Sequence, residues 1–349
     1  MKLTNIEYKK FSFPINNPLK NSHQSFTKKD IIILKANNDK GNTHFAEISP
    51  LPNFSKESID DCENILQNTF ANKFKLPVEF DNLKNTLSAF DKTPSLKFAF
   101  EQLVINSYFL ERKEIYFNLV KQSKIKVNAL LSIGEVKETI EKADDFIGKG
   151  FDTIKIKIGK NSFENDLEII KRIKGKYADR IKLRLDVNGI WDCNEAIDKL
   201  QQLTEFGIEF IEQPVELKDE LINLAAVWET PITPDESIET YEDAIEFIES
   251  GYFDFIVLKP SIRMGIFDTI KIIKFAEEKN VNVIITSAFE TAIGRSALLY
   301  LASLTKHKFA QGLGVELLGQ EIIPNRFDIE KSYVLFDANQ LPLKLHLDF

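Results

Sequence analysis

The sequence lacks several features that would assign a protein to a class at once. Its 349 residues include only two cysteines, Cys62 and Cys193, which lie far apart and outside any Cys-x-x-Cys pattern. They indicate neither a disulfide framework nor a thiolate metal site. No segment approaches the roughly 20 consecutive apolar residues that span a bilayer. The first 13 residues contain no apolar stretch of signal-peptide length, so we expect a cytoplasmic protein.

A concentrated positive charge is also missing. The formal net charge is -8 at pH 7, and the lysines are scattered along the chain rather than gathered into one basic stripe. We therefore do not expect the protein to bind nucleic acid phosphates electrostatically. Hydrophobic residues make up 43% and charged residues 28% of the chain, as in ordinary soluble globular proteins. We expect the protein to bind a small molecule and neither nucleic acid nor a membrane. We expect it to be a monomer or a homo-oligomer.

The chain contains no low-complexity linker, but its pattern changes near Lys124. Before this point residues 2–13 alternate as in a strand, and residues 55–110 carry helical spacing. We therefore predict an α+β capping domain over residues 1–124, to which the tail 321–349 returns. Residues 125–320 are predicted to form the catalytic domain.

Short apolar runs recur from residue 125 onward, and each is followed by a longer amphipathic stretch with helical spacing. The runs lie at 127–132, 153–158, 181–187, 208–211, 231–234, 255–258, 281–286 and, more weakly, near Phe309. Gly150, Gly207 and Gly251 follow three of the helical stretches, where a helix would end. Repeated strand and helix units predict a parallel sheet closed into a modified (β/α)8 TIM barrel, an α/β fold.

Polar side chains stand at the ends of the predicted barrel strands. Lys155 and Lys157 are two residues apart in one strand, so both side chains point to the same face of the sheet. The next strand has Arg184, Asp186 and Asn188 with the same alternate spacing. Barrel catalytic groups come from the C-terminal ends of several strands, so we expect these side chains to meet at one barrel mouth.

Three acidic residues follow at intervals of about one βα module: Asp186, Glu212 and Asp235. Three ionised carboxylates at one site would repel each other, and a hard divalent cation with oxygen preference relieves the repulsion. We predict that they bind Mg²⁺, with Mn²⁺ as a substitute. Such a site would bind a small-molecule carboxylate substrate and stabilise the enolate formed when its α proton leaves.

The lysines are the candidate bases. An ordinary lysine has a pKa of about 10.4, and a neighbouring amine and a metal ion both disfavour its charged form. Lys157, with Lys155 beside it, is predicted to take the proton, and Lys259 is predicted to approach the opposite face of the substrate. A single charged residue at a strand end is more often a helix cap or a solvated charge, so the hypothesis depends on the whole set.

These residues resemble the enolase superfamily, specifically its muconate lactonizing branch. The resemblance is carried by Lys155 and Lys157, Asp186 with Asn188, Glu212 before Gln213 and Pro214, Asp235 with Glu236, and Lys259 before Pro260. Within that branch, AEISPLPNFSKES at 46–58 and TSAFETAIG at 286–294 are most similar to the o-succinylbenzoate synthases. The resemblance covers nearly the whole chain.

The resemblance implies a carbon–oxygen lyase reaction of menaquinone biosynthesis. This reaction is the Mg²⁺-dependent syn dehydration of 2-succinyl-6-hydroxy-2,4-cyclohexadiene-1-carboxylate to 2-succinylbenzoate. Lys157 would take the α proton and then help the hydroxyl leave as water, while Lys259 stays cationic. The residues implied to orient the base and the ligands, or to contact the substrate, are Lys155, Arg184, Asn188, Glu236 and Ser287. A cap for the following helix is the alternative role for Ser287.

Other functions stay open. A dipeptide epimerase or N-acylamino acid racemase would use the same two lysines, but such enzymes usually carry an Asp-x-Asp pair that residues 312–318 lack. A mandelate-type enzyme would need a histidine after the seventh strand, where the sequence has none. A barrel that binds a ligand without catalysis is disfavoured by the complete set of bases and ligands. Loops at 13–27 and 49–54 are expected to fold over the barrel mouth.

Overall fold

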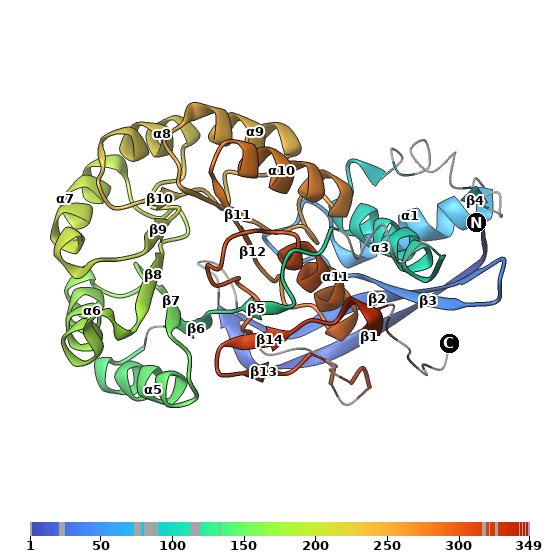
Figure 1. The fold of residues 1–349 in the computed structure, drawn as a ribbon, viewed down its shortest axis with the longest axis horizontal. Helices are drawn as coiled ribbons and strands as arrows, with labels where there is room; N and C mark the ends of the chain where they lie inside the picture. The colour runs from blue at the N-terminus through green and yellow to red at the C-terminus, as the bar shows by residue number, and fades with distance from the viewer. Residues whose placement is uncertain are drawn as a thin grey trace.

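A computed structural model describes residues 2–20, 25–72, 78–79, 87, 90–111, 119–132, 134–315, 319–320, 322–324, 327–341, 343, 345 and 347. An arc of strands with helices on its outer side lies next to an N-terminal sheet and its helices (Figure 1). No helix in this described part of the chain combines the length and the apolar character needed to cross a membrane.

The N-terminal sheet is antiparallel, with strand order β3-β2-β1-β4. Its strands are β1 (Lys2–Lys20), β2 (Ser25–Asn38), β3 (Thr43–Ile48) and β4 (Val78–Glu79), and its helices are α1 (Ile59–Asn72) and α3 (Pro94–Glu111). Strand β2 is buried on both faces. Ile32 and Leu34 join the core formed with α1 and α3, whereas Ile31 and Ile33 join the core of the barrel. Alternate residues of a strand point to opposite faces, so one strand contributes to both cores.

Parallel strands form the barrel. Strands β6 (Ala129–Ser132), β7 (Thr153–Lys157), β8 (Lys182–Asp186), β9 (Phe210–Glu212) and β10 (Ile232–Thr233) form one sheet, and β11 (Phe255–Leu258) pairs with β12 (Asn282–Ile285). The Val257 N–H donates to the Pro234 carbonyl at 3.0 Å and so links β11 to β10. Single parallel bridges join Thr286 to Gly312 and Val127 to Gln311. Residues 310–313 thus take the place of the eighth strand, and the predicted barrel fold is confirmed.

The barrel helices follow the strands along the chain, and several of them begin at a capping side chain. They are α5 (Val136–Gly148), α6 (Phe163–Tyr177), α7 (Cys193–Leu203), α8 (Lys218–Val227), α9 (Tyr241–Ser250), α10 (Ile266–Glu278) and α11 (Ala292–Ser303). Helix α9 starts with a capping box formed by Thr240 and Asp243, and it ends at Gly251, whose φ of 74° is left-handed. Every residue of α11 is buried. This helix contacts the capping strand β3 as well as the barrel strand β12.

Part of the predicted N-terminal loop is strand instead. Residues 13–20 belong to β1, which pairs with β2 as far as Lys20 and Ser25. The cross-strand pairing resumes at Leu19 after a register shift that follows Pro14. Residues 21–24, also in the predicted loop, lie outside the described residues.

The described part of the tail pairs with the segment that enters the barrel. Strands β13 (Ile329–Glu330) and β14 (Tyr333–Leu335) form a hairpin, and β14 pairs with β5 (Lys124–Lys126). The predicted domain boundary therefore falls within a strand that the tail covers.

Glu101 of α3 ties the N-terminal part to the barrel. Its Oε2 accepts hydrogen bonds from the backbone N–H groups of Ile266 and of Phe267, the latter at 3.1 Å, in the first turn of α10. These N–H groups have no partner within their own helix. The Glu101 side chain is buried, and this burial raises its pKa to about 7, although the two N–H donors favour the ionised form.

The raised pKa of Glu101 predicts a pH-dependent stability. An ordinary glutamate has a pKa of 4.5, so between that value and about 7 the folded state holds a proton that the unfolded state has lost. We therefore expect the free energy of unfolding to fall as the pH rises through this window, by up to about 3 kcal/mol from this group. Urea unfolding between pH 4.5 and 8 measures the slope.

Glu101→Gln keeps an oxygen acceptor but carries no ionisable proton, so this variant should lose the part of the slope that Glu101 contributes. Glu249→Gln, at an exposed position of α9, is the matched control and should keep it. An unchanged slope in Glu101→Gln would assign the pH dependence to other groups.

Candidate active site

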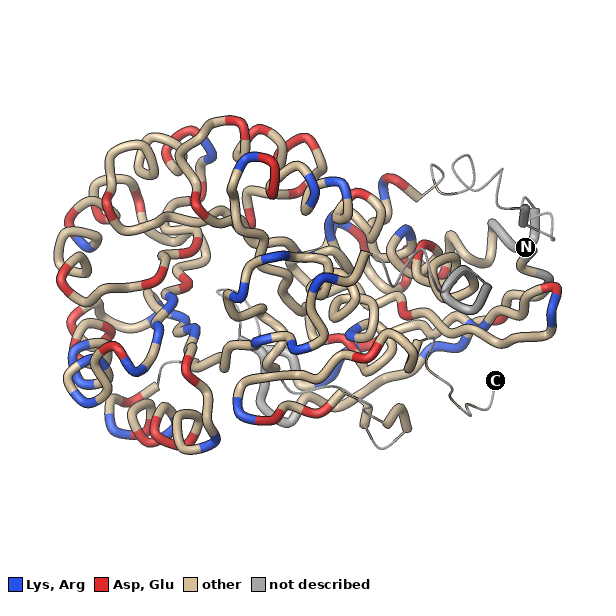
Figure 2. The backbone as a smooth tube through the Cα atoms, viewed as in Figure 1, with Lys and Arg blue, Asp and Glu red and all other residues tan. Residues whose placement is uncertain are grey.

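Strand register brings the predicted site residues to one end of the barrel. Lys155 and Lys157 of β7 lie opposite Arg184 and Asp186 of β8, and Asp186 lies opposite Glu212 of β9. Figure 2 shows basic and acidic segments next to each other along these inner strands. The register therefore places these residues next to one another on neighbouring strands.

Lys155 lies between two carboxylates. Its Nζ is 2.9 Å from Oδ2 of Asp186 and 2.5 Å from Oε1 of Glu212. All three residues are buried. Burial alone would lower the pKa of Lys155, but the surrounding carboxylates, chiefly Asp186 and Glu212, hold it above its ordinary value. Lys155 is thus a fixed cation, which suits a residue that positions the carboxylates.

Lys157 is more accessible than Lys155. Its Nζ donates to Oδ1 of Asn188 at 3.0 Å and lies 3.4 Å from Oδ2 of Asp186. Its side chain is 26% exposed, compared with 11% for Lys155. Asn188 has a left-handed φ of 55°, a conformation that asparagine tolerates better than most residues. Of the two β7 lysines, Lys157 is therefore the one that a substrate can reach.

Lys259 follows β11 and approaches from the other side. Its Nζ is 2.5 Å from Oδ2 of Asp235 and 3.2 Å from Oε1 of Glu236. Burial alone would lower the pKa of Lys259, but these two carboxylates raise it. The same Glu236 oxygen accepts a hydrogen bond from Asn188 Nδ2 at 3.1 Å. Asn188 and Glu236 thus connect Lys157 to Lys259 by hydrogen bonds.

The three predicted metal ligands differ in charge environment. Burial raises the pKa of each carboxyl group, but Lys155 and Lys157 outweigh it at Asp186, whose pKa is lowered. Lys259 likewise outweighs burial at Asp235, whose pKa is also lowered. At Glu212 burial dominates and raises the pKa, and the nearby carboxylates of Asp186 and Asp235 raise it further. The pKa is therefore lowered at two of the three carboxyl groups and raised at the third.

The three carboxylates offer the oxygen ligands that a hard divalent cation needs, but they are not arranged at metal-binding distances. Among the described residues, no group of three His, Cys, Asp or Glu side chains stands at metal-binding distances. The ammonium group of Lys155 stands between Asp186 and Glu212. Oδ1 of Asp186 is buried and accepts no hydrogen bond from the part of the chain described. Buried carboxylate oxygens of this kind are the ligands that Mg²⁺ prefers.

Arg184 lies deeper in the barrel than its predicted role requires. Its Nε donates to Oε2 of Glu209 and its Nη1 donates to the Ala310 carbonyl, both at 2.6 Å. The guanidinium carbon lies 4.6 Å from the centre of the Phe210 ring. These contacts tie β8 to β9 and to residues 310–313, so they support barrel closure rather than orientation of the base.

Ser287 is engaged within its own loop. Its Oγ donates to Oε2 of Glu290 at 2.5 Å and accepts from the Phe289 N–H at 2.9 Å. The alternative role as a helix cap is taken by Thr291, whose Oγ1 accepts from the Ile293 N–H at 3.2 Å. The hydroxyl predicted to contact a substrate therefore has two partners in the folded chain.

Comparison with known proteins decides the family. Residues 138–339, more than half of the chain, match the family described as "Enolase C-terminal domain-like". This chain belongs to the enolase superfamily. The membership predicted from the strand-end motifs is confirmed.

Similar proteins are enzymes with different reactions. This enolase superfamily chain is 26% identical over 316 residues to L-Ala-D/L-Glu epimerase of Bacillus subtilis, covering 87% of this chain and 85% of that protein. It is also 26% identical over 304 residues to o-succinylbenzoate synthase of the same species, covering 84% and 80%. The crystal structure of dipeptide epimerase from Enterococcus faecalis, complexed with Mg and L-Leu-L-Tyr, has a TM-score of 0.85 at 24% identity and covers 97% of this chain and 98% of that chain.

Gln213 is a site residue whose role the sequence did not reveal. Its buried side-chain oxygen accepts from the backbone N–H groups of Asp235, at 3.0 Å, and of Ser237, at 3.1 Å. Its Nε2 donates to the Val215 carbonyl at 2.8 Å. Gln213 thus holds the backbone that carries Asp235. Its place directly after Glu212 marked it as part of a motif, but only the fold shows that it reaches the next strand end.

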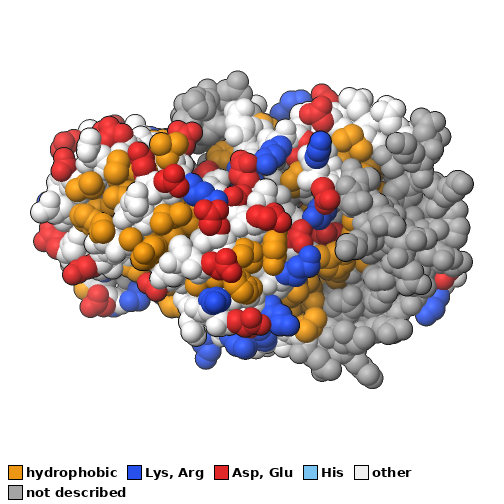
Figure 3. Space-filling model, turned by 90° about the horizontal axis from the view of Figure 1, so that it is seen from above, with side chains coloured by type: hydrophobic (Ala, Val, Ile, Leu, Met, Phe, Trp, Pro, Cys, Tyr) orange, Lys and Arg blue, Asp and Glu red, His pale blue; other side chains and the backbone are white. Residues whose placement is uncertain are grey.

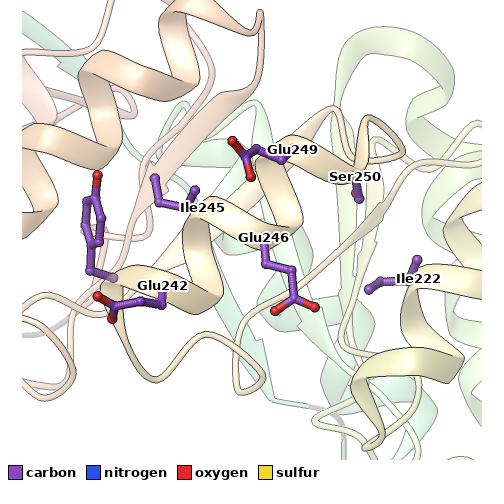
Figure 4. A pocket seen from close by; sticks show the side chains of 7 residues that line it. Ile222, Glu242, Ile245, Glu246, Glu249 and Ser250 are labelled. Carbon is purple, nitrogen blue, oxygen red and sulfur yellow. The ribbon is translucent and has the colours of Figure 1, made fainter.

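A surface groove lies apart from these residues. It has a volume of about 500 Å³ and is lined by Ile222 of α8 and by Tyr241, Ile245 and several glutamates of α9 (Figure 4). Seen from above, the molecule carries apolar side chains among acidic ones over its helices (Figure 3). None of the predicted site residues lines the groove, so the groove is separate from the candidate active site.

The position of Lys155 predicts a large effect of its removal. Lys155→Met leaves the buried carboxylates of Asp186 and Glu212 without their shared cation, so in metal-free buffer we expect a loss of about 3–5 kcal/mol in the free energy of unfolding. Urea unfolding with a chelator present measures it. Lys149→Met, which breaks an exposed pair with Asp145, is the control and should cost below about 1 kcal/mol. Equal losses in the two variants would show that Lys155 does not compensate buried charge.

Proposed function

We propose that this protein is a Mg²⁺-dependent enzyme that removes the proton α to a substrate carboxylate. The observation that carries the proposal is the approach of Lys157 and Lys259 from different strands to one group of buried carboxylates. Asp186, Glu212 and Asp235 are the proposed metal ligands. A bound Mg²⁺ would supply neutralisation of the charge that develops on the substrate carboxylate as the proton leaves. Relatives with Mg in their crystal structures support this choice of metal.

Each lysine has a separate proposed role. Lys157 takes the α proton, because its side chain is the more accessible of the β7 pair. Asn188 orients Lys157, because its Oδ1 accepts a hydrogen bond from Lys157 Nζ at 3.0 Å. Lys259 stays cationic, since Asp235 and Glu236 raise its pKa, and it stabilises the enolate from the opposite face. Lys155 holds Asp186 and Glu212 in place.

The first candidate reaction is the syn dehydration of 2-succinyl-6-hydroxy-2,4-cyclohexadiene-1-carboxylate to 2-succinylbenzoate. The α proton passes to Lys157, the bond from the ring carbon to its hydroxyl breaks, and protonated Lys157 gives its proton to the leaving hydroxyl. Water departs, and the ring becomes aromatic. The motifs at 46–58 and 286–294 and the similarity to o-succinylbenzoate synthase support this reaction.

The second candidate is epimerisation or racemisation at the α carbon of a dipeptide or an N-acylamino acid. It is favoured by the positions of Lys157 and Lys259, which contact the buried carboxylates from β7 and from the end of β11, because such enzymes use one lysine on each face. The similarity to L-Ala-D/L-Glu epimerase supports it too. The Asp-x-Asp pair expected of these enzymes is absent from the sequence at 312–318, of which residues 316–318 lie outside the described chain.

A substrate panel separates the candidates. We expect the purified protein with Mg²⁺ to convert the cyclohexadiene substrate to its aromatic product, followed by ultraviolet absorbance, and to lose this activity with a chelator. L-Ala-L-Glu, L-Leu-L-Tyr and an N-succinyl-L-amino acid are tested in parallel by deuterium incorporation at the α carbon in D₂O.

Rapid deuterium incorporation without dehydration would replace the first candidate by the second. Binding of a panel compound with neither reaction would point to a barrel that binds without catalysis.

Lys157→Ala tests the assignment of the base. Removal of a general base lowers kcat by about 10²- to 10⁴-fold, whereas Mg²⁺ affinity, measured by titration calorimetry, should change little because the carboxylates remain. Asp235→Asn is the contrasting variant and should weaken Mg²⁺ binding by at least about tenfold. Near-normal turnover in Lys157→Ala would reject this lysine as the base, and an unchanged titration in Asp235→Asn would reject that ligand.

A further inference from the structure

The loop between β12 and α11, residues 286–291, is held by two charged residues of the N-terminal sheet. Lys29 of β2 is 2% exposed, and its Nζ donates to the Ala288 carbonyl at 2.5 Å and to the Phe289 carbonyl at 3.3 Å. These residues lie about 260 positions apart in the chain. The middle of the loop is therefore fixed by a distant buried cation.

Glu47 of β3 holds the end of the same loop. It accepts hydrogen bonds from the Thr291 N–H at 3.1 Å, from Thr291 Oγ1 at 2.5 Å and from the Gly294 N–H at 3.0 Å. These donors lie at the start of α11, where backbone N–H groups have no intrahelical partner. A Cβ at Gly294 would stand 2.7 Å from Cβ of Glu290 and 3.1 Å from Oε2 of Glu47, so only glycine allows this approach. The two motifs at 46–58 and 286–294 thus contact each other.

The loop forms part of an apolar wall beside Lys259. Leu51, Ile262 and Ala288 are buried in one cluster, and Phe54 and Phe289 pack against it. These five residues make up the apolar wall. The Phe54 ring centre lies 5.5 Å from Nζ of Lys259.

Phe289 needs external support for its conformation. Its φ of 64° is left-handed, which is unfavourable for a residue with a large side chain. The hydrogen bond from Lys29 to the Phe289 carbonyl and the bond from the Phe289 N–H to Ser287 Oγ supply that support. Without the first contact, we expect the loop to relax toward more ordinary backbone angles.

Burying an ammonium group costs free energy, because the charge loses its hydration. Burial lowers the pKa of Lys29, although Glu290 and Glu47 favour its charged form. Apolar side chains of similar volume often stabilise a fold as well as a buried charge does. A lysine at this position is therefore better explained by what it holds than by core packing.

We propose that Lys29 is a positioning residue that keeps the apolar wall packed beside Lys259 by fixing the Ala288 and Phe289 carbonyls. The proposal rests on the proposed function for the role of Lys259. The group of the substrate that lies next to the wall loses its contacts when the loop relaxes, so substrate binding suffers while the reacting groups stay in place.

Lys29→Met removes both hydrogen bonds and keeps most of the volume. Hydrogen–deuterium exchange of residues 286–291 should become at least about tenfold faster in this variant, because the loop loses its anchor. For the panel compound that the unaltered chain converts, KM should rise about tenfold with kcat within about threefold of normal. Lys35→Met, on the same strand and paired with exposed Glu7, is the matched control and should change neither quantity.

Unchanged exchange in the loop, or faster exchange with normal KM, would overturn the proposal. If Lys29→Met does not fold, Lys29→Gln keeps one donor and should shift both readouts in the same direction by less. Failure of the unaltered chain to convert any panel compound would count against the proposed function, whereas the exchange measurement would still test the anchor.

Discussion

Pairing of buried ammonium groups with buried carboxylates is the constraint on which this structure depends. Lys155 stands between Asp186 and Glu212, and Lys259 stands against Asp235. Each of these charges would be very costly to bury alone. They come from different strands, and a shift of one residue in any strand would turn its side chain to the other face. Charge compensation and barrel register therefore depend on each other.

The same electrostatics divide the lysines by role. Lys155 and Lys259 have raised pKa values because carboxylates surround them, which favours their charged forms. Lys157 has longer contacts and the most exposed side chain of these lysines. A cluster that is acidic in its centre and basic at two sides suits a reaction in which negative charge grows on a carboxylate.

Carboxyl groups of the N-terminal part also accept hydrogen bonds from the first backbone N–H groups of two barrel helices. Glu47 accepts hydrogen bonds at the start of α11, and Glu101 does so at the start of α10, where Gly265 provides no side-chain cap. The barrel and the N-terminal sheet are thus joined by buried polar contacts as well as by the apolar residues of β2. Because α11 follows the loop at 286–291, these contacts lie next to the proposed active site.

Periodicity and spacing in the sequence determined the barrel, its strand order and the set of charged residues at its mouth. Alternation along a strand is a local property, so Lys155 and Lys157, and likewise Arg184 and Asp186, could be assigned to one face without a structure. Local patterns in the sequence do not show how deep a side chain lies in the barrel or which residues far along the chain it contacts. Only the tertiary structure decided that Arg184 lies below the site, that residues 13–20 continue β1, and that Lys29 and Glu47 hold a loop far along the chain. After the two cores have packed, some backbone N–H and C=O groups still need hydrogen-bond partners, and these groups decide the distant contacts. No local stretch of sequence specifies which groups they are.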